Sequence, residues 1–208
     1  MIKVWGRNNS TNVKKVLWCL EELGLPYENI PVGGQFGGNH SEDYLAMNPN
    51  GLVPCIHDSD ANLTLWKSNV IIRYLAAEYG QGSLWEQDPA RRAQGEKWMD
   101  WSGTELALAF RSVFVGLVRT PPEQRDLQQI EVSKQKCDAL MSMLDNALAQ
   151  HPWLSGEAFG VADIAPAPMV YALLNIEVTW RALPHVRDWC HRLATRPAFQ
   201  KIVMIPLS

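Results

Sequence analysis

The 208-residue sequence lacks the features that mark membrane, secreted and metal-binding proteins. No apolar run approaches the roughly 18 residues that a membrane-spanning helix needs. The first ten residues contain too short an apolar stretch for a signal peptide. The five histidines show no spacing typical of a metal site. The four cysteines are far apart and include no CxxC pair: Cys19, Cys55, Cys137 and Cys190. We therefore expect a cytoplasmic protein with reduced, structural thiols and no metal.

Neither sign of charge dominates the sequence. The 19 Lys and Arg residues are matched by 22 Asp and Glu residues, for a net charge of -3. Residues 1–85 carry 6 basic and 8 acidic side chains, and residues 86–208 carry 13 and 14. Because this distribution creates no basic face, neither nucleic acid nor a membrane is an expected partner. The apolar share of 47% is that of an ordinary globular protein with one large or two small domains.

The first 85 residues alternate strand and helix patterns. The expected order is a strand at 2–5, a helix at 12–23, a strand at 27–32, a short helix near 42–46, strands at 53–58 and 63–66, and a helix at 68–79. Apolar residues at helical spacing define the first helix, which Gly24 and Pro26 should end. The order is therefore βαβαββα.

The residues after Leu84 show only helical patterns. Helices are expected at 88–117, 123–150, 161–175 and 184–195, with a short segment near Phe199. The predicted fold class is thus α/β plus all-α, with domains at 1–82 and 86–208.

Four motifs resemble the glutathione S-transferase family over the whole chain. They read RNNSTNVKKVLWCLEELGLPYE, NPNGLVPCI, LWKSNVIIRYLAAEYG and LSGEAFGVADI. The resemblance implies a thioredoxin-like N-terminal domain, glutathione as co-substrate, a small hydrophobic electrophile, a role in detoxification and a homodimer. The fold also hosts glutathione-dependent disulfide reductases and non-catalytic binding or scaffold modules, so these remain alternatives.

The resemblance places the group that activates the glutathione sulfur in the loop before the first helix. Ser10 matches serine-type classes such as theta, and Asn12 matches bacterial relatives with a Thr-x-Asn motif. Ser and Asn at this point are also common helix caps, which is the structural alternative for both residues. No tyrosine precedes Tyr27, and Cys19 lies beyond the loop, so tyrosine-type and cysteine-type enzymes are disfavoured.

The resemblance also assigns contacts to the rest of glutathione. The Val53-Pro54 bond should be cis, with the Val53 backbone pairing with the cysteinyl part like a short added strand. Ser68 should begin a helix whose N-terminus binds the γ-glutamyl carboxylate. His40 matches a position that reaches the glycine carboxylate. Leu52 departs from the family, which often has a lysine there.

Lys67 is a second departure, because the family usually has an acid or glutamine immediately before this serine. Two like charges about 4 Å apart repel by roughly 4 kcal/mol at an effective dielectric of 20. Lys67 should therefore turn toward water or reach for a carboxylate instead of the γ-glutamyl ammonium. Asp100 and Glu105 of a neighbouring subunit are candidate acids for that ammonium.

The electrophile pocket should be lined by the first long helix of the second half. Trp98, Trp101, Glu105 and Leu108 recur at spacings of 3, 4 and 3 and so share one face. Such a stripe also suits a core or a dimer interface. The candidate pocket residues are Trp101, Glu105, Leu108 and Arg111.

Overall fold

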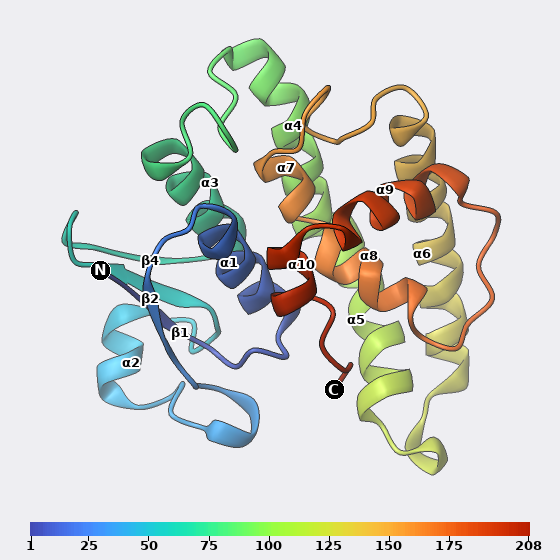
Figure 1. Cartoon of the computed structure of the whole chain (residues 1–208). Helices are drawn as coiled ribbons and strands as arrows, with labels where there is room; N and C mark the ends of the chain where they lie inside the picture. Colours follow the sequence, from blue (N-terminus) through green and yellow to red (C-terminus); the bar gives the residue numbers. More distant parts are fainter.

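The computed structural model describes all 208 residues and has a mixed N-terminal half followed by helices (Figure 1). The N-terminal half consists of β1 (Ile2–Trp5), α1 (Thr11–Glu22), β2 (Tyr27–Ile30), α2 (Glu42–Met47), β3 (Cys55–Asp58), β4 (Leu63–Trp66) and α3 (Ser68–Tyr79). The predicted order βαβαββα is confirmed, with element ends shifted by no more than two residues.

The four strands form one sheet in the order β2-β1-β3-β4. Strand β1 runs parallel to β2 and antiparallel to β3, and β4 is antiparallel to β3. Side chains alternate between the two faces, as the period of a strand requires. Ile2, Val4 and Ile56 belong to the main core with α1 and α3. Trp5 and Cys55 pack on the opposite face, where α2 lies (Figure 1).

The second half contains only helices, as predicted. They are α4 (Pro89–Trp101), α5 (Ala107–Phe114), α6 (Leu127–Leu148), α7 (Val161–Ile164), α8 (Ala167–Leu174), α9 (Pro184–Ala194) and α10 (Pro197–Ile202). None of these helices combines the length and the apolar character that crossing a membrane requires.

The helix expected at 88–117 is continuous in space but not uniform. Two wider π-helical turns, Ser102–Leu106 and Val115–Arg119, flank α5. A π-turn changes which residues share a face of the helix, because it holds more residues than an α-turn. The helix expected from 123 begins only at Leu127, where the Asp126 side chain accepts from the Gln129 amide and caps it.

Helix α1 is enclosed on all sides. It packs against α3 in its own half and against α7, α8 and α10 of the helical half. Every residue from Val13 to Leu20 is buried, including Lys14 and Lys15. The main core is a single cluster of 41 buried residues drawn from both halves. The two domains predicted at 1–82 and 86–208 therefore share one hydrophobic core. The boundary between them stays a prediction.

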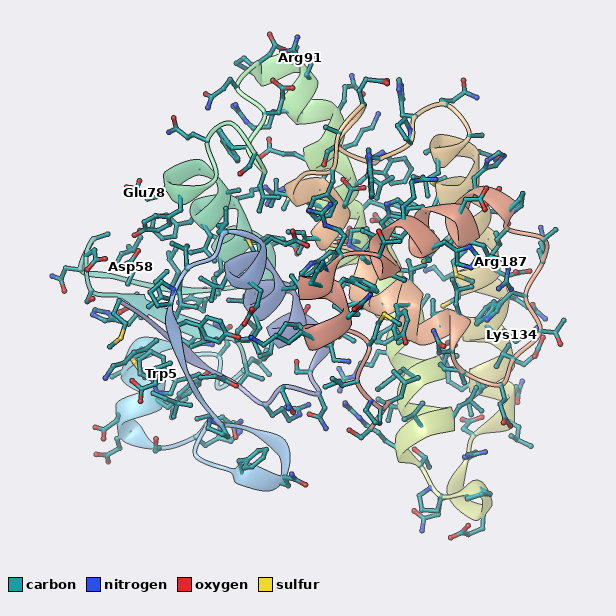
Figure 2. All side chains as sticks on the ribbon, viewed as in Figure 1. Trp5, Asp58, Glu78, Arg91, Lys134 and Arg187 are labelled. Carbon is teal, nitrogen blue, oxygen red and sulfur yellow. The ribbon has the colours of Figure 1, made fainter.

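A buried carboxylate anchors α3 to the sheet. Asp58, at the end of β3, accepts hydrogen bonds from the hydroxyls of Tyr74 and Tyr79 on α3, at 2.7 and 2.6 Å. The backbone amide of Asp60 donates to the same carboxylate. Asp58 is labelled in Figure 2. Burial alone would raise the pKa of Asp58, but the bonds from Tyr79, Tyr74 and Asp60 outweigh it and lower this pKa.

We predict that Asp58→Asn lowers the free energy of unfolding by about 2–3 kcal/mol near neutral pH, because buried hydroxyls lose a charged acceptor. The folded pKa lies below the unfolded value of about 3.9, so this stabilisation is present above that pH and is lost as pH falls through the folded pKa. Urea denaturation of both proteins at several pH values measures the difference.

The matched control is Asp60→Asn, because the Asp60 side chain is 74% exposed and pairs only at the surface with the chain terminus and Ser59. That variant should change stability by no more than about 1 kcal/mol. Equal stability of Asp58→Asn and the wild type would contradict the anchoring assignment.

Candidate active-site cleft

A cleft of about 210 Å³ lies where the N-terminal half meets the helical half. Its walls come from α1, the loop 48–54, the junction between β4 and α3, and the first π-turn with the start of α5. It brings together many of the residues predicted to bind glutathione: Asn12, Val53, Pro54, Lys67 and Ser68. Ser10 and His40 do not line it.

A larger cavity, of about 1040 Å³, lies between the segment 82–87, α4 and the loop 150–160. It contains none of the residues predicted to bind glutathione. Most of its charged side chains are already paired, Arg91 with Glu86 and His151 with Glu157, and Lys97 donates to the side chain of Gln94. The smaller cleft is therefore the better candidate for the chemistry.

The N-terminus of α3 forms one end of the cleft. The backbone amides of Ser68, Asn69 and Val70 make no hydrogen bond within the protein, and no side chain caps them. Unpaired amides at a helix start carry partial positive charge and suit an anion. The Ser68 hydroxyl donates to the Asn12 Oδ1 over 3.1 Å, which ties the starts of α1 and α3 together.

Lys67 occupies the cap position before α3 with φ 72° and ψ 108°. A residue other than glycine seldom adopts a positive φ, and such strained residues cluster at ligand sites. The side chain is exposed, and its Nζ lies 5.9 Å from the centroid of the neighbouring Trp66 ring. No carboxylate forms an ion pair with it. The cation therefore lies at the surface, beside the unpaired amides and without an acidic partner.

The Val53-Pro54 peptide bond is cis, as the resemblance implies. The Val53 amide and carbonyl make no backbone hydrogen bond. The preceding Leu52 carbonyl accepts from the Tyr44 hydroxyl and the Asn48 side-chain amide, both at 2.6 Å. The loop is thus held from behind while the Val53 backbone remains an open edge that can pair with an extended peptide.

Ser10 and Asn12 differ in their surroundings. Ser10 stands at the N-cap of α1, but its hydroxyl caps no amide, so the capping alternative is not realised. Asn12 lines the cleft, with its Oδ1 engaged by Ser68. The hydroxyl of Ser10 and the side-chain NH₂ of Asn12 both lack a partner in the protein, so each has a donor free for a ligand atom.

His40 is exposed on the loop behind the cleft. Its ring lies 2.7 Å from the point where a Cβ on Gly51 would sit, and Gly51 has φ 60°. The positive φ at position 51 therefore favours glycine, and any other residue there would also displace the His40 ring. Asn39 fixes the same turn by donating to the Gly51 carbonyl over 2.7 Å.

The candidate pocket residues of the helical half lie outside the cleft. Gly103 and Ala107 line it instead, because the π-turn Ser102–Leu106 alters the face that a regular α-helix would present. The four candidates are distributed as follows: Trp101 packs edge-on against Trp98, Glu105 bonds Thr104 at the surface, Leu108 is 70% exposed, and Arg111 is exposed. Their assignment to the electrophile pocket stays a prediction.

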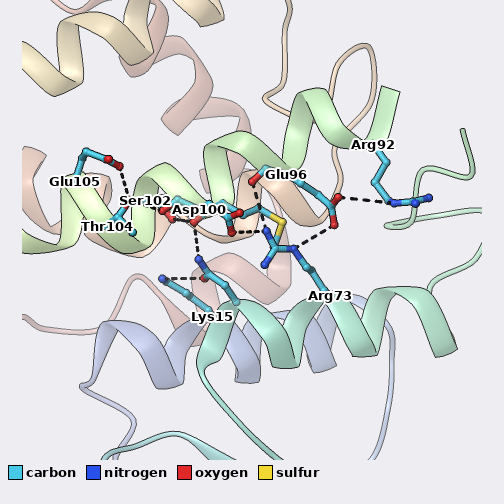
Figure 3. A network of polar contacts seen from close by, with 10 residues as sticks. Lys15, Arg73, Arg92, Glu96, Asp100, Ser102, Thr104 and Glu105 are labelled. Atoms are coloured by element: carbon cyan, nitrogen blue, oxygen red, sulfur yellow. Dashed lines mark hydrogen bonds and ion pairs between the residues drawn. The ribbon is translucent and has the colours of Figure 1, made fainter. Parts of the chain in front are cut away.

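Lys15 and Asn69 line the cleft but were not singled out from the sequence. Lys15 is 2% exposed, and its Nζ donates to the Asn69 Oδ1 over 3.2 Å (Figure 3). The Asn69 side-chain amide in turn donates to the Met99 carbonyl over 2.6 Å. Burial lowers the pKa of Lys15 to about 7. This chain of contacts links α1, α3 and α4 at the cleft.

Family models of known proteins match both halves of the chain. Residues 9–78 match the glutathione S-transferase N-terminal domain, and residues 108–197 match the glutathione S-transferase C-terminal domain. The chain is 57% identical to glutathione S-transferase GstB of Escherichia coli strain K12 over 208 residues, which is 100% of both proteins. It is 30% identical to glutathione S-transferase 4 of Zea mays over 97% of this chain and 91% of the maize protein.

Among solved structures, the chain is similar to a theta class glutathione S-transferase from Xanthomonas axonopodis pv. citri with glutathione bound. The TM-score is 0.96 at 46% identity, covering 100% of this chain and 99% of that one. The family matches, the full-length identity and the shared fold agree with one another, and they confirm the resemblance in the four sequence motifs. The chain therefore belongs to the glutathione S-transferase family.

Proposed function

We propose that this transferase conjugates the glutathione thiolate to a small hydrophobic electrophile at the cleft between α1, α3 and the loop 48–54. The observation that carries the proposal is the convergence of free donors there: the unpaired amides of the α3 N-terminus, the open Val53 backbone and the free side-chain NH₂ of Asn12. The Ser10 hydroxyl is also free, but Ser10 is not among the residues that line the cleft. Glutathione presents a carboxylate, a peptide edge and a sulfur, one for each group. The glutathione bound to the Xanthomonas relative supports the same ligand here.

The chemical step needs a thiolate. A free thiol has a pKa near 8.5, so only a few per cent is ionised near neutral pH. A hydroxyl or amide donor that bonds to the charged sulfur lowers this pKa, and a shift of about two units corresponds to roughly 2.7 kcal/mol. The thiolate then attacks the electrophilic carbon, the carbon–sulfur bond forms, and the leaving group departs with its electron pair. Ser10 is our first choice of donor, with Asn12 beside it.

The remaining contacts are assigned by chemistry. Ser68 and the amides of α3 bind the γ-glutamyl carboxylate, and Val53 with Pro54 binds the cysteinyl part. His40 is the candidate for the glycine carboxylate. Lys67 borders the site of the γ-glutamyl ammonium and weakens binding there.

We further propose a cytoplasmic homodimer that acts in detoxification. Apolar side chains beside the cleft are exposed in the single chain, among them Leu52, Trp66 and Val70. A second copy that covers this face would bury them and bring the exposed helical residues Glu105, Leu108 and Arg111, with Trp101, toward the site. Asp100 already pairs with Arg73, so Glu105 is the freer acid for the glutathione ammonium.

Two alternatives remain, and two assays separate them from the transferase. Calorimetric titration with millimolar glutathione that showed no binding would exclude both enzymes and favour a non-catalytic module. Turnover of a glutathionyl or hydroxyethyl disulfide in preference to a chromogenic aryl halide would favour a disulfide reductase, to which the free amide of Asn12 is suited. The proposal predicts glutathione binding and turnover of the aryl halide.

We predict that Ser10→Ala lowers kcat/KM toward a chromogenic aryl halide by about 10- to 100-fold, because the thiolate loses a hydrogen-bond donor. The pKa of bound glutathione, followed through thiolate absorbance, should rise in parallel. Thr11→Ala is the matched control, since it removes the adjacent hydroxyl. Full activity in Ser10→Ala would remove this assignment and leave Asn12 as the donor to be tested.

We predict that Lys67→Glu tightens glutathione binding about tenfold, because an acid replaces a cation beside the γ-glutamyl ammonium. Lys67→Gln removes the charge without adding an acid, so its affinity for glutathione should lie between those of the wild type and Lys67→Glu. Calorimetry measures all three dissociation constants. Unchanged or weaker binding in Lys67→Glu would mean that the lysine itself serves an anionic group of the ligand.

A further inference from the structure

Two neighbouring lysines are buried in α1 without an acidic partner. Lys14 is 4% exposed and Lys15 is 2% exposed, and neither forms an ion pair. Removing an ammonium from water is costly unless an anion compensates it. Each amine has one neutral hydrogen-bond partner, so the charge of its protonated form is not compensated by an anion within the protein.

The surroundings of the two amines differ. The Lys14 Nζ donates to the Val203 carbonyl over 3.1 Å and does not line the cleft, so it holds the segment after α10 against α1. The Lys15 Nζ donates to the side chain of Asn69 and lines the cleft. Burial lowers the pKa of both, to about 8 for Lys14 and to about 7 for Lys15.

Lys15 lies directly beneath the anion-binding end of α3. Asn69, its partner, is the second residue of α3, and Ser68 is the first. Asn12, one turn before Lys15 on α1, accepts from the Ser68 hydroxyl. Figure 3 shows Lys15 extending from α1 to its hydrogen-bond partner at the start of α3, below α4 in this view. The ammonium and the unpaired amides of α3 thus converge on one end of the cleft.

This arrangement concentrates positive charge and provides no anion within the protein. The amides of α3 contribute the positive end of the helix dipole, and Lys15 in its protonated form adds a positive charge in a region of low dielectric. A carboxylate that binds there would gain from both and would compensate the buried amine. The other cation of the region, Lys67, is exposed at the surface, and position 52 holds leucine, which carries no charge.

We propose that Lys15 is the cation of the subsite for the γ-glutamyl carboxylate, acting from beneath the N-terminus of α3. The inference rests on the proposed binding of glutathione in this cleft. It assigns to the carboxylate a buried charge in addition to Ser68 and the helix amides. Lys15 is then a ligand-binding residue with no part in activating the sulfur.

The test compares two ligands across matched variants. Glutathione and an analogue in which hydrogen replaces the γ-glutamyl α-carboxylate are titrated calorimetrically into the wild type, Lys15→Gln, Lys15→Met and Lys14→Met. We expect both Lys15 variants to weaken glutathione binding about tenfold, equal to about 1.4 kcal/mol, and to leave the affinity for the analogue unchanged. Lys14→Met should alter neither affinity, because its amine does not reach the cleft.

Lys15→Gln keeps a donor for Asn69 and removes only the charge, so it gives the result even if Lys15→Met does not fold. Wild-type affinity for glutathione in Lys15→Gln, or an equal loss for both ligands, would overturn the inference and leave the proposed function intact. Failure of the wild-type protein to bind glutathione would overturn the proposed function and this inference together.

Discussion

The burial of α1 on every side is the constraint on which the rest of the structure depends. A helix at the surface can turn polar residues to water, but α1 lies between α3 and the helical half and has no free face. Its two lysines must therefore find polar partners inside the protein. Lys14 takes the Val203 carbonyl and Lys15 takes Asn69, so that each amine connects α1 to another part of the chain.

The burial of α1 also fixes the positions of residues that line the cleft. Because α1 is packed on every side, the side chain of Asn12 at its start is held next to the start of α3 by the bond from Ser68. Asp58 holds α3 to the sheet through two tyrosines toward its other end. The free amides of α3 and the open backbone of Val53 consequently have fixed positions before any ligand arrives, which reduces the entropic cost of binding.

The fold was largely predictable from the sequence because its signals are local. Period-two and helical patterns with Gly and Pro at their ends defined the strands and helices, and the cis Val53-Pro54 bond followed from the family motif. The burial of Lys14 and Lys15 was not predictable, because the helix pattern indicated one apolar face, whereas α1 as a whole is covered by α3 and by the distant α7, α8 and α10. The π-turn at Ser102–Leu106 was equally unpredictable from the sequence, and it changes which residues of the long helix share the face on which Gly103 and Ala107 line the cleft.

A crystal structure of the protein with glutathione tests the central claim most directly. The account predicts the γ-glutamyl carboxylate on the amides of Ser68 and Asn69, the cysteinyl backbone paired with Val53, and the sulfur within hydrogen-bonding distance of Ser10 or Asn12. Glutathione bound in the larger cavity near Trp153, or bound in the cleft with its carboxylate away from α3, would contradict it.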